Sequence, residues 1–176
     1  MTRTLRIGIL APPAARPVPY PGIPHPEAGV TPEQILMSAD SILVVDWPSR
    51  DVPETLTRAG YTVLVKGGPE PDNFSAWQLR DGEVVVANLA RAAAHVDIVY
   101  AHRPVAELPG IVAMANRLAA TTVWCQSGRS PSGSDDPTGV WLPDGEASQA
   151  RAIVEQGGLH YINAPYIADL VRELRP

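Results

Sequence analysis

Residues 42–60 read ILVVDWPSRDVPETLTRAG, and this stretch decides the fold. The apolar run 42–45 predicts a buried strand, and Asp51 followed by Glu54 predicts a capped helix that Gly60 ends. A strand, a short turn and a helix in this order form the first unit of a nucleotide-binding α/β fold. The turn lacks the glycines that such a unit normally carries. The position of a ligand site is therefore better defined than the identity of its ligand.

Length and composition set the class of protein. A chain of 176 residues with 45% apolar and 19% charged residues is typical of one compact globular domain. The net charge of -5 opposes binding to nucleic acid or to an anionic membrane. The single cysteine, Cys125, lies in an apolar run and indicates a buried thiol in a reducing compartment. With no leader of secretory type and no histidine pair at metal-ligand spacing, we expect a cytoplasmic protein without a metal.

The first 30 residues differ from the rest. Eight of the 19 prolines fall within the first 32 residues, and each fixes φ and removes a backbone donor. We therefore expect a Pro-rich N-terminal arm at 1–30, either a leader without fixed structure or a strap lying across this subunit or a neighbour. The strap would make a homo-oligomer through the arm.

Strand and helix signals alternate through residues 31–176. Strands are expected at 42–45, 61–65, 83–87, 97–101 and 121–125, with a further apolar run at 159–162. Helical signals begin at Thr31 and cover 51–60, 89–94, 104–118, 146–156 and 165–174. This alternation predicts an α/β fold: one Rossmann-like, doubly wound, mostly parallel sheet with helices on both faces.

Ligands of such a sheet bind beyond the carboxyl ends of its strands. The candidate ligand-binding residues at those ends are Asp46, Trp47, Pro48, Ser49, Arg50, Lys66, His102, Arg103, Gln126, Ser127 and Gly128. Arg50, Lys66 and Arg103, together with Arg129, place positive charge along this edge of an acidic protein. The edge therefore favours an anionic ligand. Lys66, after the second strand, suits a ribose phosphate of the kind that CoA and NADP carry, or else is a solvated loop residue.

Three motifs resemble a known family. They are VDIVYAHRP at 96–104, LPGIV at 108–112 and VWCQSG at 123–128. In this order they are similar to the small bacterial CoA-binding proteins of the YccU type, and the resemblance spans about residues 31–162. It implies a Rossmann-like domain related to the nucleotide-binding part of the succinyl-CoA synthetase α subunit, without catalysis of its own. By position, it implies ligand contacts at 46–50, Lys66, His102, Arg103 and 126–128.

The first turn departs from that family, whose members usually have glycine directly after the first strand. This chain has Asp46, Trp47 and Pro48 there, and Asp51 adds a second carboxylate near the expected phosphate. Trp47 either stacks on an adenine or packs inside the protein. The main hypothesis is non-catalytic binding of CoA or acyl-CoA. The alternatives are a protein-association scaffold using the Pro-rich arm, and a small-molecule enzyme using His102 with Asp46.

Overall fold

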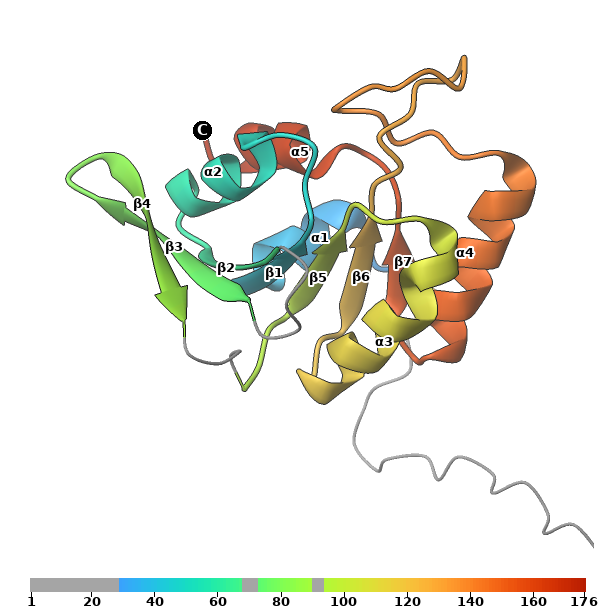
Figure 1. Cartoon of the computed structure of the whole chain (residues 1–176), viewed down its shortest axis with the longest axis horizontal. Coiled ribbons are helices and arrows are strands. Elements are labelled where there is room, and N and C mark those ends of the chain that lie inside the picture. The colour runs from blue at the N-terminus through green and yellow to red at the C-terminus, as the bar shows by residue number, and fades with distance from the viewer. Residues whose placement is uncertain (1–28, 68–72, 90–93) are drawn as a thin grey trace, which may run out of the picture.

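The structure is a computed structural model that describes residues 29–67, 73–89 and 94–176 (Figure 1). These residues form a seven-stranded sheet in the order β4-β3-β2-β1-β5-β6-β7. The strands are β1 Ser41–Val45, β2 Thr62–Lys66, β3 Phe74–Arg80, β4 Glu83–Leu89, β5 Ile98–Ala101, β6 Thr122–Cys125 and β7 His160–Ile162. The helices are α1 Pro32–Ser38, α2 Asp51–Arg58, the 3₁₀ turn η1 Val105–Glu107, α3 Leu108–Arg117, α4 Asp144–Gln156 and α5 Ile167–Leu174. The expected Pro-rich arm lies outside the described residues except for its last two.

The predicted doubly wound sheet is confirmed. β1 pairs in parallel with β2 on one side and β5 on the other, and the parallel order continues through β6 and β7. The chain thus moves outward in one direction from β1 to β2 and later in the opposite direction from β5 to β7. The carboxyl ends of β1 and β5 flank the point where the strand order reverses, which is the ligand position in folds of this kind.

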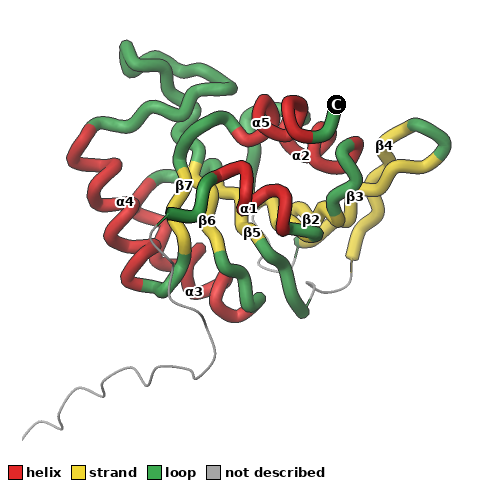
Figure 2. Tube along the Cα trace, turned by 180° about the vertical axis from the view of Figure 1, so that it is seen from behind, coloured by secondary structure: helices red, strands yellow, loops and turns green. Residues whose placement is uncertain are grey.

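Successive side chains of a strand point to opposite faces of the sheet, and each face packs against its own group of helices. Ile42 and Val44 of β1 pack into a core with α1, α2 and α5, whereas Leu43 packs into a second core with α3 and α4. The two views show these helix groups on opposite faces of the sheet (Figures 1 and 2). The predicted apolar face of residues 108–118 is buried in the second core. In the described part of the chain, no helix has the length and apolar character needed to cross a bilayer.

The antiparallel end of the sheet differs from the sequence prediction. β3, at Phe74–Arg80, was not predicted, and it pairs antiparallel with β2 and with β4, which confirms the strand predicted at 83–87. Asp81 and Gly82 join β3 to β4 with φ of 51° and 82°, as a two-residue turn between antiparallel strands requires. The helix expected at 89–94 is wrong at its start, since Leu89 ends β4, and residues 90–93 lie outside the described residues.

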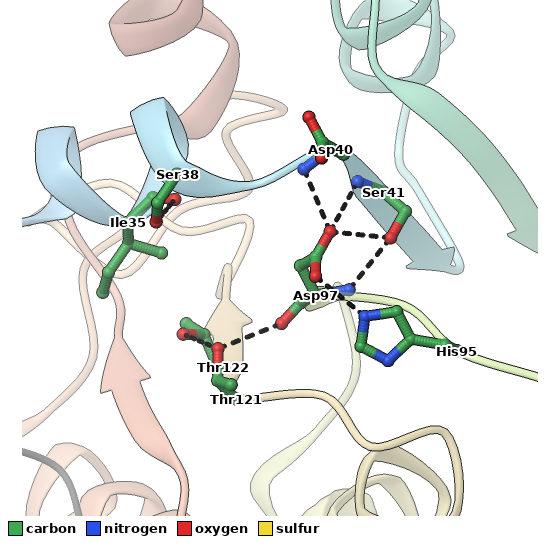
Figure 3. A network of polar contacts seen from close by, with 8 residues as sticks. All are labelled: Ile35, Ser38, Asp40, Ser41, His95, Asp97, Thr121 and Thr122. Atoms are coloured by element: carbon green, nitrogen blue, oxygen red, sulfur yellow. Dashed lines mark hydrogen bonds and ion pairs between the residues drawn. The ribbon is translucent and has the colours of Figure 1, made fainter. Parts of the chain in front are cut away.

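At the amino ends of the central strands β1 and β5, Asp97 ties the two strands together (Figure 3). One oxygen of its carboxylate accepts hydrogen bonds from the backbone N–H groups of Asp40 and Ser41 at 2.9 and 2.8 Å, and from the Ser41 hydroxyl at 2.8 Å. The other oxygen lies 2.9 Å from His95 Nε2. This network joins the start of β1 to the segment before β5. Asp97, part of the first family motif, therefore has a structural role far from the ligand edge.

Candidate functional site

An ion pair spans the point where the strand order reverses. Asp46 directly follows β1 and Arg103 follows β5, and Asp46 Oδ2 accepts a hydrogen bond from Arg103 Nη1 at 2.8 Å. Arg103 also donates to both oxygens of Glu107, at 2.8 and 2.7 Å. Two of the predicted site residues thus meet at the predicted place. The charge of Arg103 is shared between two carboxylates.

Asp46 keeps the backbone shape of a glycine turn without being glycine. Its φ is 59°, in the left-handed region that glycine adopts freely and that aspartate tolerates better than most residues. Its Oδ1 accepts a hydrogen bond from the Trp47 N–H at 2.8 Å, which supports this conformation. The turn therefore follows the expected path, but a carboxylate occupies the space that glycine would leave open.

Trp47 packs toward the antiparallel end of the sheet. A Cβ added at Gly67 would lie 2.8 Å from Trp47 Cη2, so the indole lies directly across the end of β2. The same indole meets the Trp77 ring edge to face, with centroids 6.4 Å apart. Its surroundings are those of a packed side chain, as one of the two sequence interpretations expected.

Arg50 and Lys66 lie on this same side of the site. The Arg50 guanidinium is 4.8 Å from the centre of the Trp77 ring, and its Nε donates to Glu54 at 2.7 Å. The Lys66 ammonium is 5.9 Å from the centre of the Phe74 ring. The predicted positive edge is thus divided, since Arg50 lies over the β3 side while Arg103 lies at the β1–β5 junction.

The start of α2 is built differently from the prediction. Asp51 was expected to cap the helix, but Arg50 occupies the cap position and no side chain makes the capping hydrogen bond. The Asp51 carboxylate instead accepts hydrogen bonds from the Tyr166 hydroxyl at 2.9 Å and from Arg172 of α5. Both carboxylates of this turn therefore have an arginine partner. The repulsion expected from Asp46 and Asp51 toward a phosphate is partly offset.

His102 and Gly128 are in direct contact across β5 and β6. Gly128 has a φ of 67°, and a Cβ added there would collide with His102 Nε2, so both conformation and space require glycine. The half-buried position of His102 lowers the pKa of its imidazole, and nearby Arg103 lowers it further against the opposing effect of Asp46. These surroundings therefore favour the neutral form of the imidazole. Among the described residues, the oxygens of Asp46 bond to Trp47 and Arg103 and none is hydrogen-bonded to His102.

Gln126 holds the loop that follows β6. Its side chain is buried, its Oε1 accepts a hydrogen bond from the Tyr100 hydroxyl, and its Nε2 donates to the Pro137 carbonyl at 2.7 Å. Ser127 Oγ accepts from the Arg129 N–H at 3.2 Å, and the Gly128 N–H donates to the Gly139 carbonyl at 3.0 Å. The polar groups of residues 126–128 thus fold this loop back on itself beside the carboxyl end of β6.

A cavity of about 200 Å³ opens between this loop, the turn after β5 and the first turns of α4. It is lined by His102, Arg103, Pro104, Val105, Leu108, Cys125, Gln126, Ser127, Arg129, Leu142, Glu146 and Ala150. Four of the predicted site residues lie in its wall. The residues from α3 and α4 and the loop residue Leu142 were missed, because their contribution depends on how distant segments pack. In the part of the chain that the structure describes, no group of three metal-ligating side chains is found.

A family model for the CoA binding domain matches residues 44–168. The chain belongs to this family. The match begins within β1 and covers the first turn and the turns after β5 and β6, so it includes every residue of the predicted site. The narrower YccU-type assignment stays a prediction.

Two solved structures are similar to this chain. The crystal structure of Prb, the PH1109 protein redesigned for binding, is 18% identical, with a TM-score of 0.50 and coverage of 81% of this chain and 88% of that one. The structure of cell-free ID.343 from Thermus thermophilus is 25% identical, with a TM-score of 0.48 and coverage of 80% and 93%. The first supports the fold alone. A search of curated proteins found no match.

Proposed function

We propose that this protein binds CoA or an acyl-CoA at the carboxyl edge of β1, β2, β5 and β6, and has no turnover of its own. The observation that carries the proposal is the CoA-binding family match over residues 44–168, which contains the whole of this edge. The turn at Asp46 with its left-handed backbone, placed where the strand order reverses, supports the same position.

The chemical groups of CoA have suitable partners along the edge. In this proposal the diphosphate lies at the start of α2, where backbone N–H groups and Arg50 are available. The Arg50 side chain is 60% exposed, so its ion pair with Glu54 is worth little and is easily exchanged for a phosphate. Lys66 holds the ribose phosphate. The pantetheine arm runs past Arg103 toward residues 126–128.

Two measurements test binding itself. CoA at a hundred times its dissociation constant stabilises the folded state by about 2.7 kcal/mol, which a thermal melt detects. Native mass spectrometry of the freshly purified protein identifies any retained ligand by its mass. A protein that melts unchanged with CoA and carries no adduct contradicts the proposal.

Lys66 offers a sharper test because it is the only lysine in the sequence. Reductive ¹³C-methylation labels its amine and the N-terminal amine, and we expect CoA to shift the Lys66 resonance. Dephospho-CoA, which lacks the 3′-phosphate, should shift it much less. Lys66→Ala should weaken CoA and leave dephospho-CoA unchanged, while Arg117→Ala, an exposed position at the end of α3, should affect neither. Equal shifts from both ligands would remove Lys66 from the site.

Protein association is the second candidate function, and the exposed apolar side chains of the β3–β4 hairpin favour it. Leu79 and Val86 are each 47% exposed near the outer strand of the described sheet. A scaffold of this kind should ignore CoA in the melt but change its oligomeric state when residues 1–30 are removed. Light scattering after size exclusion compares the two chains. If the number of subunits per particle is the same in both chains, the arm has no role in association.

A further inference from the structure

The cavity beside β5 and β6 has a wall of a different kind from the ligand edge. Val105, Leu108, Leu142 and Ala150 make part of this wall apolar, beside the polar side chains of His102, Gln126 and Ser127. Charged groups lie at the rim: Arg129 is 3.9 Å from Glu146, and Arg103 is held by Asp46 and Glu107. The apolar part of the wall is therefore suited to a hydrocarbon rather than to a phosphate or a sugar.

We infer that this cavity holds the acyl group of a short-chain acyl-CoA. This inference rests on the proposed function and specifies its ligand. His102 and Arg103 belong both to the ligand edge and to the cavity wall, so the two are continuous. A ligand whose diphosphate lies at the start of α2 has its thioester end free to reach this wall. The acyl group is the only end of an acyl-CoA that is an uncharged hydrocarbon.

The size of the cavity limits the length of the acyl chain. A dry protein cavity of about 150 Å³ takes up benzene, whereas drug-sized ligands need about 300–1,000 Å³. A volume of about 200 Å³ therefore admits an acyl group of roughly four to six carbons. Long fatty acyl groups do not fit. Because the Arg129–Glu146 pair balances the charge at the rim, an acyl group ending in a carboxylate gains nothing there.

Cys125 is a passive part of the wall. Burial raises the pKa of its thiol to about 12, so the group is an uncharged thiol at neutral pH and does not attack a bound thioester. The only thiol of the chain is therefore consistent with binding without acyl transfer.

The test compares dissociation constants of CoA, acetyl-, butyryl-, hexanoyl-, succinyl- and palmitoyl-CoA with the full chain by calorimetry. We expect butyryl-CoA to bind on the order of tenfold more tightly than CoA, since each buried methylene contributes about 0.8 kcal/mol. Palmitoyl-CoA should bind no more tightly than hexanoyl-CoA, and succinyl-CoA no more tightly than CoA. If CoA binds but the short acyl groups add nothing, the inference is wrong and the proposed function stands. If no member of the series binds, the proposed function itself fails.

Two variants locate the acyl group. Ala150→Leu fills the cavity from α4 and should abolish the preference for butyryl-CoA while leaving CoA affinity unchanged. Ala152→Leu, exposed on the same helix, should retain both the preference and the CoA affinity. Should Ala150→Leu fail to fold, Leu142→Ala, which enlarges the cavity, should shift the preference to a longer chain. A loss of CoA affinity equal to the loss of butyryl-CoA affinity, or an unchanged preference in Leu142→Ala, would show that the cavity holds something else.

Discussion

Asp46→Gly restores the residue that the resembled family usually has after the first strand, and we expect it to tighten CoA binding. The substitution removes a negative charge from the turn proposed to hold the diphosphate and releases Arg103 from its 2.8 Å ion pair. The backbone should tolerate the change because glycine adopts a φ of 59° without strain.

The magnitude follows from the charge and its exposure. Two unit charges 4 Å apart interact by about 1 kcal/mol in water and by about 4 kcal/mol at an effective dielectric constant of 20. The Asp46 side chain is 46% exposed, so the value lies near the water limit. The expected gain is about 1.4 kcal/mol, a tenfold lower dissociation constant. Folding stability should change little, because the lost ion pair is exposed and worth about 0–1 kcal/mol.

The assay is calorimetric titration of CoA at low and high salt, paired with a thermal melt. Asp46→Asn keeps a residue that tolerates the left-handed conformation and removes only the charge, so it should also tighten binding. Glu155→Gln is the matched control, because that equally exposed carboxylate pairs with Arg151 near the end of α4, away from the start of α2. If both Asp46 variants bind CoA no better than the unaltered protein, the diphosphate does not lie beside Asp46.

Three more substitutions have defined outcomes. Asp97→Asn weakens a four-bond network and should lower the free energy of unfolding in urea by about 1–3 kcal/mol. Burial raises the pKa of Asp97, but hydrogen bonds from Asp40, Ser41 and His95 lower it more, so its net pKa is below the usual value. The stabilisation by Asp97 should therefore be present above the unfolded pKa and be lost as the pH falls through the folded pKa. The Asn variant should not show this loss. Gly128→Ala should lower both the melting temperature and CoA affinity, whereas Gly110→Ala, where a methyl group meets no neighbour, should leave CoA affinity unchanged. Arg172→Ala should lower the free energy of unfolding by about 1 kcal/mol in urea without changing the CoA dissociation constant.

The parallel half of the fold could be predicted because its signals are local. The apolar runs became β1, β2, β5 and β6 within a residue or two, since strands buried on both faces are almost uninterruptedly apolar. The second strand of the hairpin was predicted at 83–87 and is confirmed as β4, but its partner β3 was missed although the Asp81-Gly82 pair, flanked by strand-forming residues, is a strong hairpin signal. Polar residues on the exposed part of β3 hid its alternation.

The candidate site was predictable in position but not in arrangement. That residues after β1 and β5 meet follows from topology alone, and Asp46 and Arg103 do meet. That Trp47 turns toward Trp77, and carries the site's aromatic group away from the β1–β5 junction, depends on β3, which was not anticipated. The cavity could not be predicted from the sequence either, because α4 and the loop after β6 contribute to it from distant parts of the chain.

The first turn shows how a site can keep its shape while its chemistry changes. The left-handed backbone at Asp46 preserves the path of a glycine turn, but its carboxylate pairs with Arg103, the arginine that follows β5. An anionic group that reaches that guanidinium competes with Asp46 for it, so part of its binding energy is spent on separating the pair. Because the pair is exposed, that cost is about 1 kcal/mol or less, and raised salt should reduce it further. In the proposed binding mode, the absence of glycine therefore weakens the phosphate end of this site without closing it, and the apolar cavity at the other end is the larger source of selectivity.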